Sequence, residues 1–206
     1  AILRARETGQ GQVIDGAITD GCAVMSSLIQ GLRAQRLWAD RRQSNVLDGG
    51  AHWYDCYECA DGEWVSVGAL EPQFYRLLLE KCGLAGEGLE DAQFDFANWS
   101  RLKERLAGVF RGKTRAEWCE LLEGTDVCFA PVLNLAEAQV HPHNVARQAY
   151  VDVAGVRQPA PAPRFSATPA EIRSPPAGIG AQSAELLRAA GYGDEEIARL
   201  ASAGIV

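Results

Sequence analysis

The sequence lacks any apolar run that approaches the roughly 18 residues needed to span a bilayer. It also has no block of basic residues, and its 20 basic and 27 acidic side chains give a formal charge of −7. Proteins that bind nucleic acid or anionic membranes present positive charge on the surface that binds. The sequence therefore predicts a protein that binds neither nucleic acid nor membrane.

Cysteine is scarce. The six cysteines, at positions 22, 56, 59, 82, 119 and 128, are too few for a disulfide scaffold, and no secretory signal accompanies them. Cys56 and Cys59 have the spacing of a redox pair or half a zinc site, but no second such pair follows. The neighbouring acids Asp55, Glu58 and Asp61 raise the pKa of a thiol rather than lower it. We expect reduced, mostly buried thiols in a cytoplasmic protein.

Histidine is also scarce, with one residue at 52 and two at 141 and 143. Two imidazoles that flank Pro142, without a nearby cysteine or aspartate, make a poor metal site. Pro142 instead fits the first turn of a helix, where its missing N–H leaves no hydrogen bond unmade. We therefore expect no metal ion.

The remaining composition, 47% hydrophobic and 23% charged, is typical of a chain that folds around a core. With 206 residues, the chain is long for one domain and short for two. It begins at Ala1, without methionine and without a charged and then apolar leader, so we expect a cut or processed end.

The pattern of apolar residues changes twice in the first third of the chain. A glycine-rich turn before Val13, Ile14 and Asp15 predicts a short strand, and apolar residues at helical spacing predict a buried helix over 18–32. Residues 33–56 then lose periodicity but contain Trp53 and Tyr54, whose rings need a surface to pack on. We interpret this stretch as an extended arm that lies against other protein.

The middle of the chain alternates strands and helices. The Asp-Gly turn at 61–62 precedes a strand over 63–67, and helices are predicted over 72–82 and 99–110. Thr114 and Glu117 have the spacing of a capping box that begins a third helix. Pro131 restricts the strand within 126–133 to an edge or a bend. These elements predict a compact α/β unit.

The last third contains short elements. Asn134 and Glu137 predict the cap of a short helix, and residues 149–157 predict a hairpin. Three prolines between 158 and 163 favour extended backbone and a linker. Two further helices are predicted, at about 181–190 and 194–202, with Asp194 as the N-cap of the second.

Glu71 is the most informative acid, because it stands between an apolar strand and the helix that Pro72 begins. A carboxylate there either caps the helix or performs catalysis, since unpaired N–H groups favour negative charge at a helix N-terminus. Gly49 and Gly50 either bring backbone close to a ligand or turn the chain. No nucleophile motif is present in the sequence.

Eight stretches of the sequence then carry a resemblance. They are residues 9–15, 45–51, 54–62, 67–75, 116–119, 124–128 with 131–132, 141–144 and 161–165. In this order they resemble the family III CoA-transferase superfamily, and most closely its alpha-methylacyl-CoA racemase branch. The Glu-Pro-Gln-Phe-Tyr motif at 71–75 favours that branch. The resemblance covers only the C-terminal part of a family member.

The resemblance implies an α/β fold in which this chain forms the small domain and carries arms that belong to an absent Rossmann-like large domain. Residues 1–32 would be a remnant of the large domain (a strand plus a helix), 33–56 a linker arm, 57–145 the small α/β domain, 146–163 a return linker, and 164–206 a segment that returns to the large domain. It further implies an interlocked homodimer, with each active site between the large domain of one subunit and the small domain of the other.

The implied reaction is the epimerisation of 2-methylacyl-CoA thioesters through an enolate, which needs an acid and a base on opposite faces of the α-carbon. The resemblance places the histidine and aspartate that do this upstream of Ala1, so we expect the chain to be inactive alone. It implies a catalytic role for Glu71 in support of that histidine. No cofactor is implied, because the CoA thioester is the substrate, and the implied substrate-binding residues are Gly49, Gly50, His52 and Tyr54.

Three alternatives remain open at this point. His52 stands where the racemases have proline, and it either alters the preferred acyl shape or lies on the outer face of the arm. The intact protein is alternatively a CoA-transferase that moves CoA between carboxylic acids through an acyl–aspartyl anhydride. A third hypothesis is a non-catalytic dimerisation module.

Overall fold

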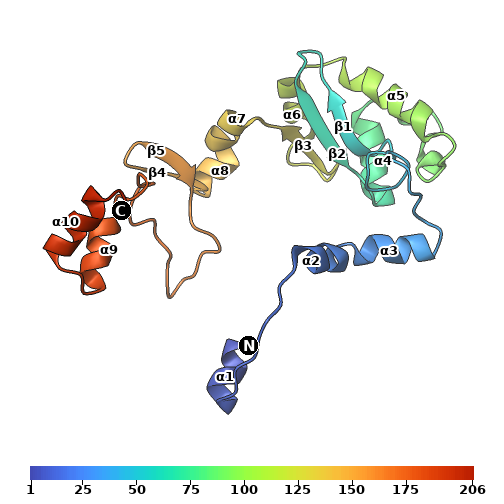
Figure 1. Ribbon diagram of the computed structural model, residues 1–206. Coiled ribbons are helices and arrows are strands. Elements are labelled where there is room, and N and C mark those ends of the chain that lie inside the picture. The colour runs from blue at the N-terminus through green and yellow to red at the C-terminus, as the bar shows by residue number, and fades with distance from the viewer. The chain divides into compact units, whose positions relative to one another are not determined.

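The computed structural model describes residues 1–206, which form two compact units, residues 1–132 and residues 133–206. Each unit has its own strands and helices (Figure 1). We describe each unit by itself. The five domain ranges implied by the resemblance stay a prediction about the intact protein.

A three-stranded antiparallel sheet forms the centre of the first unit. Its strands are β1 (Tyr54–Glu58), β2 (Trp64–Gly68) and β3 (Phe129–Val132), in the order β1-β2-β3. Gly62, with φ of 78°, makes the predicted turn between β1 and β2. Pro131 lies opposite Val65 on an edge strand, which confirms its predicted position.

Helices cover one face of this sheet (Figure 1). They are α4 (Pro72–Lys81), the short 3-10 helix η1 (Glu90–Ala92), α5 (Trp99–Phe110) and α6 (Arg115–Leu122). The predicted helix over 99–110 is confirmed to the residue. Tyr57, Val65 and Val67 point to this face and join the apolar side chains of the helices in one core. The alternate residues of β1 and β2 face the other way, as the period-two pattern requires.

The predicted capping box at α6 is present. The Thr114 hydroxyl accepts from the Glu117 backbone N–H, and the Glu117 carboxylate accepts from the Thr114 backbone N–H at 2.8 Å. We expect Thr114→Ala to lower the free energy of unfolding by about 1 kcal/mol, because the capping box no longer satisfies the two backbone N–H groups at the start of the helix. Thr114→Ser keeps the hydroxyl and should retain most of that stability in urea denaturation. Equal losses in the two variants would contradict this assignment.

The first 34 residues differ from the prediction. They form α1 (Ile2–Thr8), α2 (Ile18–Met25) and α3 (Ser27–Ala34), and none of these helices buries a residue. The predicted strand at 13–15 is wrong, because Val13 is 96% exposed and no strand lies beside it. The predicted single buried helix is also wrong, since it breaks at Ser26. Both predictions required a packing surface that this chain does not supply.

The arm predicted over 33–56 packs on the chain's own core at its C-terminal end. Ala51, His52 and Trp53 are at most 1% exposed, and Tyr54 already belongs to β1. The Trp53 ring meets that of Trp99 at 90°, with the centroids 6.2 Å apart. The aromatic residues of the arm therefore find part of their predicted packing surface inside this unit.

The second unit contains only short elements. They are α7 (Leu135–Val140), α8 (Pro142–Ala146), the hairpin β4 (Tyr150–Val153) with β5 (Val156–Pro159), α9 (Ser183–Ala189) and α10 (Asp194–Ser202). The Asn134 cap, the Pro142 helix start and the hairpin are confirmed. Asp194 is the first residue of α10 rather than its N-cap, which is Gly193. None of the helices in the chain has the length and apolar character to cross a membrane.

Candidate functional site

The face of the sheet opposite the helices carries a cleft. We call it the open face; it presents Tyr54, Cys56, Trp64, Ser66 and Gly68, and Tyr54 and Trp64 remain 38% and 44% exposed. The cleft has a volume of about 480 Å³ and also takes its lining from the segments beside the sheet. Its lining residues are Leu47, Gly49, Tyr54, Asp55, Cys56, Ser66, Val67, Gly68, Cys128, Phe129 and Ala130.

Tyr54 and Gly68 fit closely at the floor of this cleft. They are opposite each other in the β1–β2 ladder, and a Cβ at position 68 would lie 3.4 Å from the Tyr54 ring. Glycine at 68 therefore leaves room for the Tyr54 ring beside β2. Of the predicted substrate-binding residues, Gly49 and Tyr54 line the cleft, whereas Gly50 and His52 do not.

The loop that carries Gly49 is held by Asp48. The Asp48 carboxylate accepts hydrogen bonds from the Asn45 backbone at 2.8 Å, the Asn45 side chain at 2.7 Å and the Gly50 backbone at 3.1 Å. Burial raises the pKa of Asp48, but these hydrogen bonds outweigh it and lower the pKa below its ordinary value. Asp48 is thus a turn acid, and it gives the loop a fixed shape.

Gly50 packs directly on backbone. A Cβ added there would lie 2.7 to 2.8 Å from backbone atoms of Ser44 and Asn45, which cannot move without breaking the Asp48 turn. Gly50 thus shapes the loop, since the atoms it approaches closely belong to the backbone of the chain itself and not to a ligand.

We expect Gly50→Ala to destabilise the first unit by about 2 kcal/mol, because a fixed backbone has to yield to the new methyl group. The midpoint of urea denaturation measures this. Gly108→Ala is the matched control, since Gly108 lies in α5 with nothing within 4 Å of an added Cβ. The control should be neutral or slightly more stable than the wild type. If Gly50→Ala left the denaturation midpoint unchanged, the backbone of the loop would be free to move away from the added methyl group.

His52 is buried in the core. Its Nε2 lies 2.7 Å from the Tyr75 hydroxyl, which donates to the Leu89 carbonyl at 3.1 Å, so the proton of the ring belongs on Nε2. The other ring nitrogen, Nδ1, is buried without a partner, and burial lowers the pKa of His52 to about 4. The alternative that placed His52 on the outer face of the arm is wrong, because the residue is 1% exposed.

Glu71 is exposed at the start of α4. Its backbone is extended, with φ of −74° and ψ of 139°, as expected for a residue before proline, and its carbonyl accepts from Phe74 and Tyr75 at 3.0 Å. Glu71 is the N-cap residue of α4, as one of the two alternatives expected, but it caps through its backbone, and its side chain makes no cap hydrogen bond. The carboxylate is therefore available to another group.

Glu71 also lies close to the cleft. Burial raises the pKa of the Cys128 thiol, and the charges of Glu71 and Asp126 raise it further. Cys128 lines the cleft and enters β3 in the left-handed region, with φ of 54°. The charge of Glu71 thus acts on a residue that lines the open-face cleft, although Glu71 is not itself one of the lining residues.

Sequence reasoning missed a charge pair beside the cleft. Lys103 of α5 pairs with Asp55 of β1, and its ammonium group also donates to the Gly49 carbonyl at 2.6 Å. The pair ties the glycine loop, the edge strand and the helix together. No sequence spacing could have indicated it, because residues 55 and 103 meet only after the sheet and α5 have packed.

None of the six cysteines forms a disulfide in this structure, and the reduced state stays a prediction. Only Cys59 and Cys82 are buried, so the prediction of mostly buried thiols is wrong. Burial and the Asp55 charge raise the pKa of Cys56, and burial and the Asp61 charge raise the pKa of Cys59 to about 11. The acids beside the Cys-x-x-Cys thus act in the predicted direction and disfavour thiolate chemistry.

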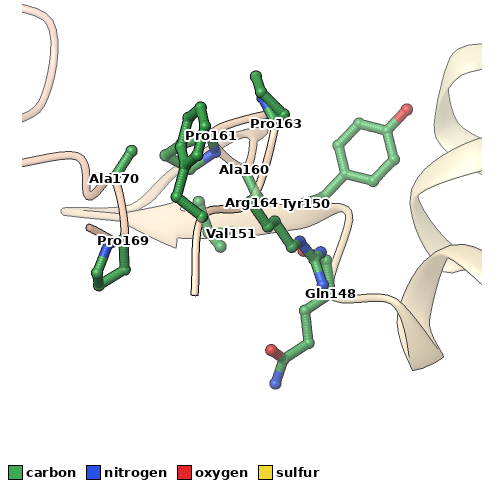
Figure 2. A pocket seen from close by; sticks show the side chains of 10 residues that line it. Gln148, Tyr150, Val151, Ala160, Pro161, Pro163, Arg164, Pro169 and Ala170 are labelled. Atoms are coloured by element: carbon green, nitrogen blue, oxygen red, sulfur yellow. The ribbon is translucent and has the colours of Figure 1, made fainter. Parts of the chain in front are cut away.

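Two other hollows lack an acid–base pair suited to catalysis. One of about 790 Å³, beside α3, includes Arg33, Trp38 and Phe96, but Asp40 pairs with Arg33 at 2.5 Å. The other, of about 480 Å³ in the second unit, is shown in Figure 2. Half of its lining residues are proline or alanine, and Arg164 points toward Gln148, whose carbonyl it binds at 3.1 Å. None of the predicted site residues lines either hollow.

Comparison with known proteins gives a consistent result. The sequence profile of CoA-transferase family III matches residues 1–183. The chain is 43% identical over 209 residues to alpha-methylacyl-CoA racemase of Mus musculus and 40% identical over 213 residues to that of Homo sapiens. Both matches cover 100% of this chain and 54% of the relative, so the chain spans about half the length of these curated relatives.

The fold has counterparts among solved structures. A crystal structure of a CAIB/BAIF family protein from Brucella suis matches with a TM-score of 0.67 at 23% identity. The match covers 91% of this chain and 50% of that protein. This likeness concerns the fold alone, and it confirms the predicted α/β class.

Proposed function

Because this chain belongs to CoA-transferase family III, we propose that it supplies the C-terminal part of an acyl-CoA racemase. The observation that carries the proposal is Glu71, which stands between β2 and α4 with an exposed carboxylate that makes no cap hydrogen bond. The choice of the racemase branch is supported by the 43% and 40% identity to two racemases over the whole chain.

The proposed reaction inverts C2 of a 2-methylacyl-CoA thioester. A base removes the C2 proton, and the electrons of the C–H bond move onto the thioester oxygen as an enolate. An acid on the opposite face returns a proton to C2, so the product differs from the substrate only in configuration. Both groups need pKa values near the working pH. In this proposal, both groups belong to a part of the intact protein outside this chain.

Glu71 would act through the histidine among those groups. A carboxylate that accepts a hydrogen bond from an imidazole orients its ring and stabilises its protonated form. The extended backbone imposed by Pro72 holds Glu71 at the end of the core rather than on a loose loop. A rigid support of this kind keeps the ring aligned with the α-carbon through the whole cycle.

The acyl-CoA would lie along the open-face cleft. We assign direct contact to Gly49 and Tyr54, which line it, and a shaping role to Gly50 and His52, which hold the loop from behind. In this proposal the intact protein is an interlocked homodimer, because the large domain of one subunit would close the cleft of the other. The proposed reaction uses neither a cofactor nor a metal ion.

Exchange at C2 tests the proposal. The full-length protein that contains this chain is incubated in deuterated water with one epimer of a 2-methylacyl-CoA, and the product is followed by mass spectrometry and chiral analysis. We expect one deuterium at C2 and formation of the other epimer. This chain alone should catalyse neither process. Exchange by the isolated chain would contradict the placement of the acid and base outside it.

The second candidate function is CoA transfer between two carboxylic acids, and the name of the matching family favours it. Such an enzyme passes through an acyl–enzyme anhydride on an aspartate, which hydroxylamine traps. Trapping of that intermediate, together with no exchange at C2, would replace the racemase proposal. A non-catalytic dimerisation module would show neither reaction and would sediment as a stable dimer without affinity for acyl-CoA.

A further inference from the structure

Gln93 occupies the point where the sheet passes into α4. It follows η1, is 4% exposed, and its side-chain amide donates to the carbonyls of Ala69 at 3.1 Å and Leu70 at 2.7 Å. Both partners are carbonyl oxygens, which only accept, so the chemistry requires the nitrogen of the amide on this side. One buried side chain thus holds two consecutive peptide carbonyls.

Those carbonyls belong to the two residues before Glu71. Ala69 and Leu70 have left β2 and have not yet entered α4, so neither the sheet nor the helix provides a partner for their carbonyls. Ala69 is fully buried, and a buried carbonyl without a donor costs about 1–3 kcal/mol, so the backbone shifts to avoid that state. On the other side of Glu71, Pro72 fixes the entry into the helix. Gln93 and Pro72 therefore fix the backbone of Glu71 from both sides.

Gln93 is itself held in place. Its backbone carbonyl accepts from the indole N–H groups of Trp53 and Trp99, each at 2.8 Å. The Trp53 carbonyl in turn accepts from the Ala69 backbone N–H at 3.0 Å. The junction before Glu71 and the residue next to Tyr54 thus belong to one hydrogen-bonded unit with Gln93 at its centre.

We propose that Gln93 is a positioning residue for the Glu71 carboxylate. This inference rests on the proposed function, in which Glu71 supports the catalytic histidine. When the amide is removed, the junction relaxes and the carboxylate leaves its place beside the imidazole. A misplacement of the order of 1 Å is enough to slow catalysis strongly. Gln93 touches neither the substrate nor the reacting atoms, so it acts only through Glu71.

The variant that tests this is Gln93→Met in the full-length protein, because methionine fills similar space and donates no hydrogen bond. We expect kcat for exchange at C2 to fall about tenfold with KM within about twofold, since a group that acts mainly in the transition state is displaced. The lower pKa of the pH–rate profile should also fall, because the imidazolium loses its carboxylate. Trp118→Phe is the matched control; it removes an indole hydrogen bond to the Phe110 carbonyl, and should leave kcat and the profile unchanged.

A double-mutant cycle separates positioning from general damage. In a Glu71→Gln background, Gln93→Met should have almost no further effect on kcat, since the group it positions is already absent. An undiminished effect there would overturn the inference. If the full-length protein shows no exchange at C2, the proposed function fails; if exchange occurs but Glu71→Gln leaves it unchanged, the role of Glu71 and this inference fail while the function stands. If Glu71→Gln slows exchange and Gln93→Met does not, only the role of Gln93 fails.

Gln93→Asn provides the same test if Gln93→Met does not fold. Its amide is one methylene shorter and loses reach to the two carbonyls, while a polar group stays in the same place. The expected results are the same fall in kcat and the same shift of the pH profile. A folded Gln93→Asn protein with wild-type kcat and profile would overturn the inference.

Discussion

Glu71→Gln in the full-length protein should slow deuterium exchange at C2 of a 2-methylacyl-CoA at least about tenfold, which is less than the roughly hundredfold effect of a direct general acid or base, because Glu71 acts through the histidine. The amide has the shape of the carboxylate but no charge, so it no longer stabilises a protonated imidazole. Folding should be unaffected, because the Glu71 side chain is exposed and makes no cap hydrogen bond. The measurement is the rate of deuterium incorporation at saturating substrate.

Asp126→Asn is the matched control for this variant. Asp126 and Glu71 both raise the pKa of Cys128, so the two carboxylates share the same neighbourhood. Removal of the Asp126 charge should change exchange by less than about twofold, because only Glu71 is proposed to contact the imidazole. If the Glu71→Gln protein catalyses deuterium exchange at C2 as fast as the wild type, Glu71 contributes only its backbone at the start of α4.

The second large effect concerns pH and stability. Burial lowers the pKa of His52 to about 4 in the folded protein, whereas a histidine in the unfolded chain has its ordinary value of 6.5. Between these two values the unfolded state binds the extra proton, so stability falls as the pH decreases. Above pH 6.5 neither state binds it, and stability no longer depends on His52. From pH 7 to pH 5 the free energy of unfolding should decrease by about 2 kcal/mol from this residue.

Tryptophan fluorescence during urea denaturation measures this change, because all five tryptophans lie in the first unit. His52→Gln removes the titration and keeps a group able to reach Tyr75, so its stability should vary much less between pH 7 and pH 5. His143→Gln, at an exposed position, should keep the wild-type dependence. An unaltered pH dependence in His52→Gln would assign the effect to other groups.

Features that depend on neighbouring residues could be predicted from the sequence. The helix over 99–110 begins and ends as predicted because its apolar residues repeat at helical spacing within one element. The capping box of Thr114 and Glu117 involves residues only three positions apart. The position of Glu71 before Pro72 was predictable for the same reason, since a proline restricts the residue before it.

Features that depend on distant residues could not be predicted. His52 is buried because Tyr75 and the core close over it, and no local pattern indicates that contact. In the sequence, Gln93 is indistinguishable from any other polar loop residue, although its side chain donates to the carbonyls of Leu70 and Ala69, 23 and 24 positions away. The strand predicted at Val13 needs a neighbouring strand, and propensity alone cannot supply one.

The edge position of Pro131 affects how copies of this protein meet. An exposed apolar sheet face beside a free strand edge invites another chain to add a strand and start an aggregate. A proline within an ordered edge strand turns its nitrogen away from the neighbouring strand, so the outer side of β3 lacks an N–H at that point. Incoming strands therefore cannot complete a ladder there, which leaves the open face accessible without making the β3 edge a template for fibres.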